Sequence, residues 1–242
     1  LTAMMARRAA AVVTVEIDAH LFELASELLL ELSNVTMLRF DALRNKNNFD
    51  DRVMEAVGTQ LAASPGRRLK LVANLPYNIA TPVVSNMLLA PHVPHSMVVT
   101  IQKELADRMT AAPSTKDYSA LSVWMQSQCK VETVRVLPPS VFWPIPKVTS
   151  AIIRITIDPE RRARIGDLKY FHQFVKAIFI HRRKFLRANV QPAMKRHLSR
   201  EQVDAILDEM GFAPDTRTEQ LDVDTLLAFA EKVRAAAPDW TL

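Results

Sequence analysis

The sequence predicts an α/β domain with a mainly parallel sheet over residues 1–158 and a small all-α domain over residues 159–242. Short apolar segments typical of buried strands alternate with amphipathic helical segments along the first part of the chain. This alternation stops at Asp158 and Pro159, after which only helical patterns follow. Because three successive strands of the first part end in polar residues, we expect a ligand site at one edge of its sheet.

The first half of the α/β domain is predicted from the spacing of its apolar residues. Val12 to Ile17 carries a charge only near its end, which is typical of a buried strand. From Ala19 to Leu32 the leucines recur at helical spacing, with glutamates four apart on the other face. The expected elements are the end of a helix over residues 1–8, a strand over 12–17, a helix over 19–32, a strand over 35–40, a helix over 49–61 and a strand over 69–73.

Prolines help to delimit the second half of this domain. A helix is expected to open with Thr81 as its N-cap and Pro82 at its first position, where proline is favoured. Pro138 and Pro139 are expected to end a strand, because proline cannot donate a ladder hydrogen bond. The other expected elements are strands over residues 97–101, 131–137 and 148–157 and helices over 102–110 and 118–129.

The C-terminal domain is predicted to consist of helices only. Its apolar residues recur at helical spacing, and Gly211 is expected to end the third helix. The expected helices cover residues 170–180, 185–197, 200–210 and 223–235.

The positive charge of the chain is concentrated in one segment. The 242 residues are 49% hydrophobic and 24% charged, as in globular proteins, with a net charge of +5. Residues 161–200 contain twelve basic residues and one acid, so this segment carries +11 and the remainder −6. Such asymmetry indicates a polyanionic partner, although the same charges could form a solvated helical face.

The single cysteine, Cys129, excludes an internal disulfide framework and a multi-cysteine zinc site. It lies in an apolar stretch and is interpreted as a core residue. No apolar run approaches the roughly 20 residues of a membrane span. We expect a cytoplasmic protein, monomeric, without a metal ion and without a membrane partner.

Three successive predicted strands end in a polar residue, namely Glu16, Asp41 and Asn74. In nucleotide-binding α/β domains, an acid about 20 residues beyond a glycine-rich loop accepts hydrogen bonds from ribose hydroxyls. Glu16 suits this role, and Asp41 could accept from an adenine amino group. The same count places the glycine loop before Leu1, so we expect that an N-terminal piece is absent, in agreement with the 4 glycines. Alternatively, Glu16 and Asp41 are only helix N-caps.

The stretch Asn74-Leu75-Pro76-Tyr77 places an amide, a rigid proline and an aromatic ring together after a strand. Pro76 lacks an N–H and fixes its own φ, and it pushes Leu75 to extended geometry. The carbonyls of this turn can therefore face a ligand and accept hydrogen bonds from an amino group, while Tyr77 offers a flat face.

This tetrapeptide resembles the signature of amino-directed methyltransferases. Its leucine form, followed by Asn78–Pro82, is similar to the motif of the ribosomal RNA adenine dimethyltransferases. Further stretches match this family in the same order along nearly the whole chain. They are Val15–Asp18, Asp41–Ala42, Gln102–Glu104 with Arg108, Tyr118 with Leu121–Ser122, Phe142–Val148 with Ser150–Ala151, and Arg182–Lys184 with Arg187 and Asn189.

The resemblance implies a Rossmann-like, S-adenosylmethionine-dependent methyltransferase domain followed by a small helical RNA-binding domain. It also implies that the methyl donor is held by Glu16, Ile17, Asp41, Ala42 and Asn74. The implied target is two neighbouring adenosines in a loop of small-subunit rRNA, modified during ribosome biogenesis. The chain departs from the family pattern because it lacks the glycine loop.

The adenine amine is a poor nucleophile, because its lone pair is delocalised into the ring. We expect Asn74 and a backbone carbonyl at Leu75 or Pro76 to accept its two N–H bonds and so orient the lone pair. Tyr77 is expected to stack on the base, with Phe142 on its opposite face.

Basic residues are expected to hold the phosphates of the RNA. Arg183 and Arg187 would share a face of a helix and could instead anchor the helical domain to the sheet domain. Phe142 and Trp143 could likewise be packing residues. The expected phosphate contacts are Lys103, Arg108, Lys147, Arg182, Arg183, Lys184 and Arg187.

The function that the sequence favours is N6,N6-dimethylation of two adenosines of small-subunit rRNA, with S-adenosylmethionine as the methyl donor. A near alternative is a large-subunit rRNA adenine methyltransferase of the antibiotic-resistance type. An alternative of another class is a ribosome-assembly or RNA-binding factor that keeps the fold without catalysis.

Overall fold

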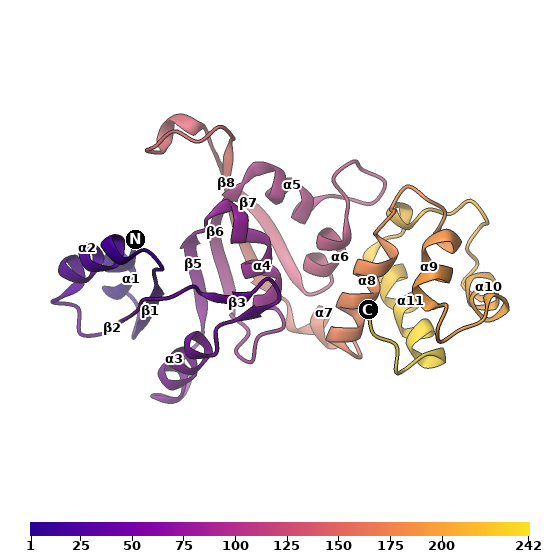
Figure 1. Cartoon of the computed structure of the whole chain (residues 1–242), viewed down its shortest axis with the longest axis horizontal. Helices are drawn as coiled ribbons and strands as arrows, with labels where there is room; N and C mark the ends of the chain where they lie inside the picture. Colours follow the sequence, from indigo (N-terminus) through magenta and orange to yellow (C-terminus); the bar gives the residue numbers. More distant parts are fainter. The chain divides into compact units, whose positions relative to one another are not determined.

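The computed structural model describes residues 1–242, which divide into two compact units (Figure 1). The first unit comprises residues 1–71 and 76–95, and the second comprises residues 72–75 and 96–242. The predicted domain boundary at residue 158 does not coincide with this division, because the C-terminal helices belong to the same unit as the strands that precede them.

The first unit is built on two parallel strands. β1 pairs with β2 from Val12 opposite Val35 to Val15 opposite Leu38. The polar ends of both strands therefore point to the same edge. The elements of this unit are α1 (Thr2–Ala6), β1 (Val12–Val15), α2 (Ala19–Leu29), β2 (Val35–Leu38), β3 (Leu43–Asn45), β4 (Asn48–Phe49), α3 (Asp51–Ala62), the start of β5 (Lys70–Asn74) and α4 (Tyr77–Met87).

The hairpin of β3 and β4 was not predicted. Its strands have only three and two residues, which is too short to show an alternating apolar pattern. The turn between them is stabilised by Asn45, whose side-chain oxygen accepts from the Asn47 N–H at 2.8 Å.

The start of α4 corrects a prediction. The N-cap is Pro76 and not Thr81, and Pro82 lies inside the helix instead of at its first position. The Ile79 N–H bonds to the Pro76 carbonyl at 3.1 Å, so the helix begins directly after the turn. Pro82 is tolerated in the second helical turn at the cost of one backbone hydrogen bond.

The second unit combines a four-stranded sheet, in the order β5-β6-β8-β7, with the remaining helices. In β6 every second residue is buried, as expected for a strand with one face on a core. The elements are β6 (Ser96–Gln102), α5 (Lys103–Thr110), α6 (Ala120–Gln126), β7 (Cys129–Leu137), η1 (Pro139–Val141), β8 (Ser150–Ile157), α7 (Pro159–Ala163), α8 (Leu168–Ile178), α9 (Leu186–Met194), α10 (Arg200–Glu209), η2 (Thr218–Gln220) and α11 (Val223–Ala236).

The prediction of a mainly parallel sheet misses the reversal of one strand, β8; β6 and β7 still run in the same direction, because each pairs antiparallel with β8. The segment between β7 and β8 contains only the short helix η1 and no α-helical crossover, so the chain returns beside β7 in the opposite direction. This segment, residues 138–149, projects from the sheet and is called the β7–β8 loop below (Figure 1).

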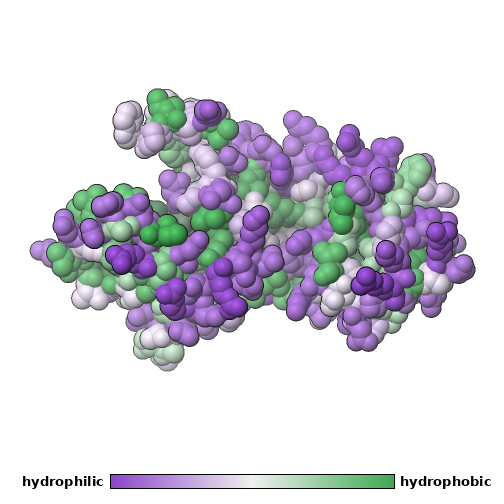
Figure 2. Space-filling view, in the orientation of Figure 1, coloured by the Kyte–Doolittle hydropathy of each residue, from purple (hydrophilic) through white to green (hydrophobic).

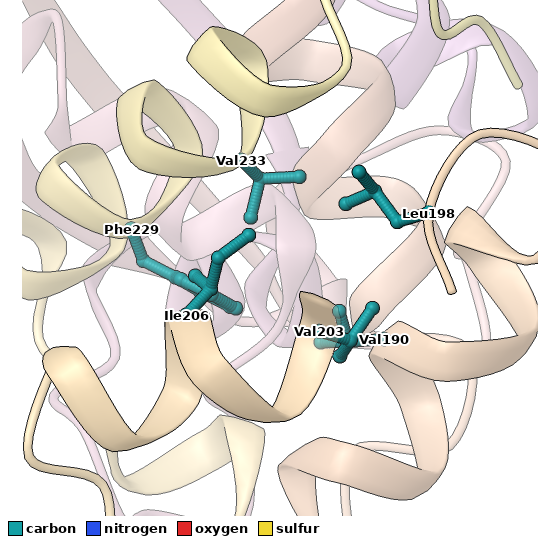
Figure 3. Close-up of a pocket in the computed structure, with 6 residues that line it drawn as sticks. All are labelled: Val190, Leu198, Val203, Ile206, Phe229 and Val233. Carbon is teal, nitrogen blue, oxygen red and sulfur yellow. The ribbon is translucent and has the colours of Figure 1, made fainter. Parts of the chain in front are cut away.

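The C-terminal helices form an apolar core. α8 packs against α6, α9 and α11. Side chains from α9, α10, α11 and the α9–α10 connection converge on a small pocket (Figure 3), lined by Val190, Leu198, Val203, Ile206, Phe229 and Val233. This pocket presents only aliphatic and aromatic carbon, so its role is packing. None of the helices is long and apolar enough to cross a lipid bilayer.

Candidate active site

Asn74 and Leu75 lie at one edge of the sheet of the second unit. The Leu75 N–H donates to the Thr100 carbonyl of β6 at 3.2 Å, near the end of that strand. At the same edge, the last residue of β6 and the last residue of β7 both pair with Ser150, the first residue of β8. The β7–β8 loop therefore rises from the edge that carries Asn74.

In the turn after β5, the Asn74 side-chain oxygen and the Leu75 carbonyl are the acceptors available to a ligand. Asn74 is exposed, and its side chain makes no hydrogen bond within the chain, whereas the Leu75 side chain is buried and anchors the turn. The Pro76 carbonyl already accepts from Ile79. Of the two predicted carbonyl acceptors, Leu75 is therefore the better placed. Tyr77 is half-buried as the first residue of α4.

Phe142 and Trp143 differ sharply in exposure. Phe142 is half-buried at the end of η1, where its N–H donates to the Pro139 carbonyl at 3.1 Å. Trp143 is 93% exposed. Packing therefore remains an alternative for Phe142, whereas the packing interpretation of Trp143 is wrong.

In the first unit, Glu16 follows β1, and its N–H donates to the Leu38 carbonyl of β2 at 2.9 Å. Its Oε1 accepts from the Asp18 N–H at 2.9 Å. Asp41 lies beyond the end of β2, and its Oδ1 accepts from the Leu43 N–H at 2.9 Å. Both carboxylates thus follow parallel strands at the same edge, and each has one oxygen engaged by its own backbone.

The interpretation of Glu16 and Asp41 as helix N-caps is wrong. Asp18 caps α2, and Asp50 caps α3. The second oxygen of each carboxylate has no partner in the chain and suits the hydroxyl and amino donors of a nucleoside. The residues present therefore fit the nucleoside part of S-adenosylmethionine. Their neighbours in the predicted cofactor site, Ile17 and Ala42, are exposed and half-buried respectively.

The predicted RNA contacts on α5 are in ion pairs. Lys103 Nζ lies 2.6 Å from an Asp107 carboxylate oxygen, and Arg108 bonds to Glu104. Both pairs are four residues apart on a solvent-exposed face. Such pairs contribute roughly 0.3–0.5 kcal/mol, so a phosphate can displace the carboxylates at small cost.

Arg182 holds the turn between α8 and α9 to the segment before α6. Its guanidinium donates to the Tyr118 carbonyl at 2.6 Å and lies 3.7 Å from the Glu219 carboxylate. Tyr118 is buried, its hydroxyl donates to the Leu221 carbonyl at 2.9 Å, and burial raises the pKa of this phenol. These contacts favour a structural role for Arg182.

The other basic residues of this turn are more accessible. Arg183 and Lys184 are exposed and form no ion pair, whereas Arg187 lies 3.2 Å from Asp204. The proposed shared helical face of Arg183 and Arg187 is wrong, because α9 begins only at Leu186. Within residues 182–187, the cations that face solvent without a carboxylate partner are thus Arg183 and Lys184.

Cations of the β7–β8 hairpin add to the same sheet edge. Lys147 is exposed on the loop, as predicted for an RNA contact, and Arg135 is exposed near the end of β7. Arg135 was not among the predicted contacts. The sequence does indicate that Arg135 is available to a phosphate, since no acidic residue occurs between Glu132 and Asp158.

Comparisons with known proteins show which proteins this chain resembles. The chain is 37% identical over 225 residues to the ribosomal RNA small subunit methyltransferase A of Bacillus mycoides, covering 93% of this chain and 74% of that protein. The enzyme of the same name from Bacillus cereus gives the same identity and coverage.

Two solved structures have a similar fold. A dimethyladenosine transferase from Plasmodium falciparum matches with a TM-score of 0.79 at 19% identity, covering 97% of this chain and 86% of that chain. The 23S rRNA methyltransferase ErmE matches with a TM-score of 0.61 at 24% identity, covering 96% and 85%. These likenesses confirm the predicted Rossmann-like methyltransferase fold with its helical C-terminal part.

The family model described as "Ribosomal RNA adenine dimethylase" matches residues 1–234, nearly the full length of the chain. This match agrees with the resemblance drawn from the tetrapeptide at Asn74 and the stretches collinear with it. The chain belongs to the ribosomal RNA adenine dimethylase family.

Proposed function

We propose that this chain transfers methyl groups from S-adenosylmethionine to the N6 amines of two adjacent adenosines in a loop of small-subunit rRNA. Membership of the ribosomal RNA adenine dimethylase family establishes the reaction class and the methyl donor. The names of the Bacillus relatives support the small subunit as the source of the substrate. The observation that carries the site assignment is the pair of unengaged acceptors, Asn74 and the Leu75 carbonyl, at the exposed edge of the sheet.

The acceptors would act by orienting the amine. The Asn74 side-chain oxygen and the Leu75 carbonyl each accept one N–H of the adenine amine, which directs the nitrogen lone pair out of the ring plane. Both acceptors also stabilise the positive charge that develops on nitrogen during transfer. S-adenosylmethionine supplies a methyl group that is already activated, so no base must first remove a proton.

Positioning then accounts for much of the rate. Tyr77 would stack on the base, which brings the amine within attack distance and excludes water, and Phe142 is a second candidate for stacking on it. In each transfer the nitrogen would gain the methyl group, the donor would leave as a neutral thioether, and one N–H proton would be released to solvent. After the first transfer the nitrogen therefore keeps one N–H, so one acceptor still orients it for the second. Glu16 and Asp41 would bind the ribose and adenine of the methyl donor, with Ile17 and Ala42 beside them.

The RNA would be held by cations outside the pocket. Arg183, Lys184 and Lys147 are exposed and unpaired, whereas Lys103, Arg108 and Arg187 must exchange a carboxylate for a phosphate. Arg182 would act by holding the turn that carries Arg183 and Lys184. The target adenosine must leave its stack, which costs less in a loop than in a duplex.

We also propose that the protein works as a cytoplasmic monomer without a metal ion. The transfer requires no Lewis acid, because the methyl donor is already activated. The single cysteine, Cys129, is buried, and desolvation raises the pKa of its thiol to about 12, so it stays protonated and is a poor metal ligand. Light scattering should give the mass of one chain, and a chelator should leave the methylation rate unchanged.

The decisive experiment is methylation of immature small subunits, followed by mass analysis of the rRNA. Asn74→Ala should lower kcat by roughly 10²–10³, the usual cost of removing one transition-state hydrogen bond, while RNA affinity is retained. Asn78→Ala is the matched control, because Asn78 is also an exposed amide in the same segment. Wild-type turnover in Asn74→Ala would contradict the mechanism, and dimethyladenosine in large-subunit rRNA would favour the alternative substrate.

A second experiment separates the roles of the cations. Arg183→Ala combined with Lys184→Ala should weaken RNA binding and flatten its salt dependence by about 0.7–0.9 log units per lost phosphate contact. Arg182→Ala should instead lower thermal stability. If the double variant keeps the wild-type salt slope, these two residues do not contact phosphate.

A further inference from the structure

The β7–β8 loop presents an aromatic side chain that the proposed mechanism does not use. Trp143 is 93% exposed, whereas the other tryptophans, Trp124 and Trp240, are 1% and 3% exposed. Exposing a whole indole to water forfeits the burial of roughly 150–250 Å² of aromatic surface. An aromatic ring displayed in this way is available to a partner.

The backbone of the loop that carries this ring is restrained at both ends. Its two ends are paired where β7 ends and β8 begins, and the Lys103 N–H donates to the Thr149 carbonyl at 2.9 Å. Four prolines restrict the backbone between them, and η1 closes one turn before Phe142.

Phe142 and Trp143 point in different directions. The backbone at Phe142 is extended, with φ −112° and ψ 150°, and in extended chain successive side chains point to opposite faces. Phe142 is half-buried and Trp143 fully exposed, in agreement with this geometry. If Phe142 stacks on the target adenine, Trp143 faces outward, where the neighbouring nucleotides of the RNA would lie.

The charged residues nearest to Trp143 in the sequence are cations, which suits a nucleic acid as its partner. Lys147 and Arg135 are the charged residues of the loop and of the adjoining end of β7, and the nearest acids in the sequence are Glu132 and Asp158. Hydrophobic side chains also gather on the projecting loop (Figure 2). An exposed flat ring on a loop whose charged side chains are cations is the pattern on which single-stranded nucleic acids stack.

We propose that Trp143 stacks on an unpaired base beside the target adenosine and so selects single-stranded rRNA loops over duplex. This inference rests on the proposed function, because it takes the target to be an adenosine of rRNA. In this proposal, Trp143 contributes to RNA affinity by stacking on one base, and Lys147 contributes by contacting a phosphate.

Fluorescence of the full-length chain tests the stacking directly. Because Trp124 and Trp240 are buried, quenching by RNA reports on Trp143. A short oligoadenylate should quench the emission saturably, and the same strand in a duplex should quench it much less. Trp143→Phe should abolish the quenching, because the variant lacks the indole that emits. The phenylalanine ring still offers an aromatic face to the base.

Kinetics on immature small subunits provide the second readout. Trp143→Ala should raise KM roughly 10-fold, in line with loss of one base–aromatic stack, with kcat unchanged at saturating substrate. Trp143→Phe should restore most of the affinity. Ile145→Ala is the matched control, because Ile145 is 65% exposed on the same loop and is not aromatic. All three variants should melt like the parent chain.

The outcomes separate this inference from the proposed function. Methylation with no quenching by oligoadenylate, or with wild-type KM in Trp143→Ala, overturns the stacking and leaves the enzyme. Quenching by oligoadenylate in a chain that methylates no rRNA supports the stacking and contradicts the enzyme. Quenching by intact subunits but not by oligoadenylate or purified rRNA would indicate a ribosomal protein as the partner and overturn the proposal.

Discussion

Helices α2 and α8 begin alike and pack differently. Each has 11 residues, and each is capped by an aspartate, Asp18 or Asp167, whose side chain accepts an N–H at 2.9 Å from the third helical residue. Six residues of α8 are buried, whereas in α2 only Leu29 is buried. The signals that start a helix are therefore independent of the packing that stabilises it.

The difference bears on the proposed site. α2 follows Glu16, on the side assigned to the cofactor, and its leucines at positions 21, 24 and 28 form an exposed stripe. α8 precedes the basic turn and is surrounded by aromatic side chains. Sparse burial permits local opening, so amide hydrogens should exchange faster in α2 than in α8.

The largest expected effect is the loss of a ring from α8. Phe174 is fully buried, with its ring 5.3 Å from that of Phe229 in an edge-on arrangement. Phe174→Ala should lower the free energy of unfolding by about 3–5 kcal/mol, because it removes buried surface and leaves a cavity. Urea unfolding followed by circular dichroism measures it. A loss below about 1 kcal/mol would show that α8 is not held by its core contacts.

A second prediction uses acid to test the same helix. The ring of His172 lies 4.5 Å from that of Trp124, and burial, assisted by Lys176, lowers its pKa from 6.5 to about 4. Since the unfolded chain binds this proton more readily, stability should fall as the pH drops through 6.5 towards 4, and between pH 7 and pH 5 the loss should be roughly 2 kcal/mol. His172→Phe should remove this part of the acid sensitivity in urea titrations at pH 7 and pH 5. An unchanged pH dependence in the variant would contradict the assignment.

The helix caps provide a matched pair. Asp18→Ala and Asp167→Ala remove the same hydrogen bond, and each should cost its helix about 1 kcal/mol. In α8 the loss should appear in global unfolding, whereas in α2 it should appear mainly as faster local amide exchange. Equal global losses from both variants would show that α2 unfolds together with the core.

The site was predictable where chemistry lies in adjacent residues. Asn74 and Leu75 are read from one tetrapeptide, and Glu16 from the end of an apolar run. The start of α4 was missed because the preference for proline at a first helical position competes with a turn that already begins at Pro76. Local rules thus give candidate groups, whose roles stay predictions, but they placed the start of this helix wrongly.

Long-range contacts were beyond local rules. Arg182, Arg183 and Lys184 are equivalent in sequence, and only the contact of Arg182 with Tyr118, 64 residues earlier, distinguishes it. The antiparallel return of β8 depends likewise on how it pairs between β6 and β7. The exposure of Trp143 is a third case, because the same apolar loop would be compatible with a packed ring.

The smallest expected effect concerns the exposed stripe of α2. Leu24 is 56% exposed, so Leu24→Ala removes little buried surface and replaces leucine by the best helix former. The change in unfolding free energy should stay within about 0.5 kcal/mol, roughly a tenth of the effect of Phe174→Ala. Urea unfolding at two protein concentrations measures it. A large loss that grows with concentration would mean that a second copy covers the stripe in solution, and the contrast between α2 and α8 would then be one of partners and not of packing.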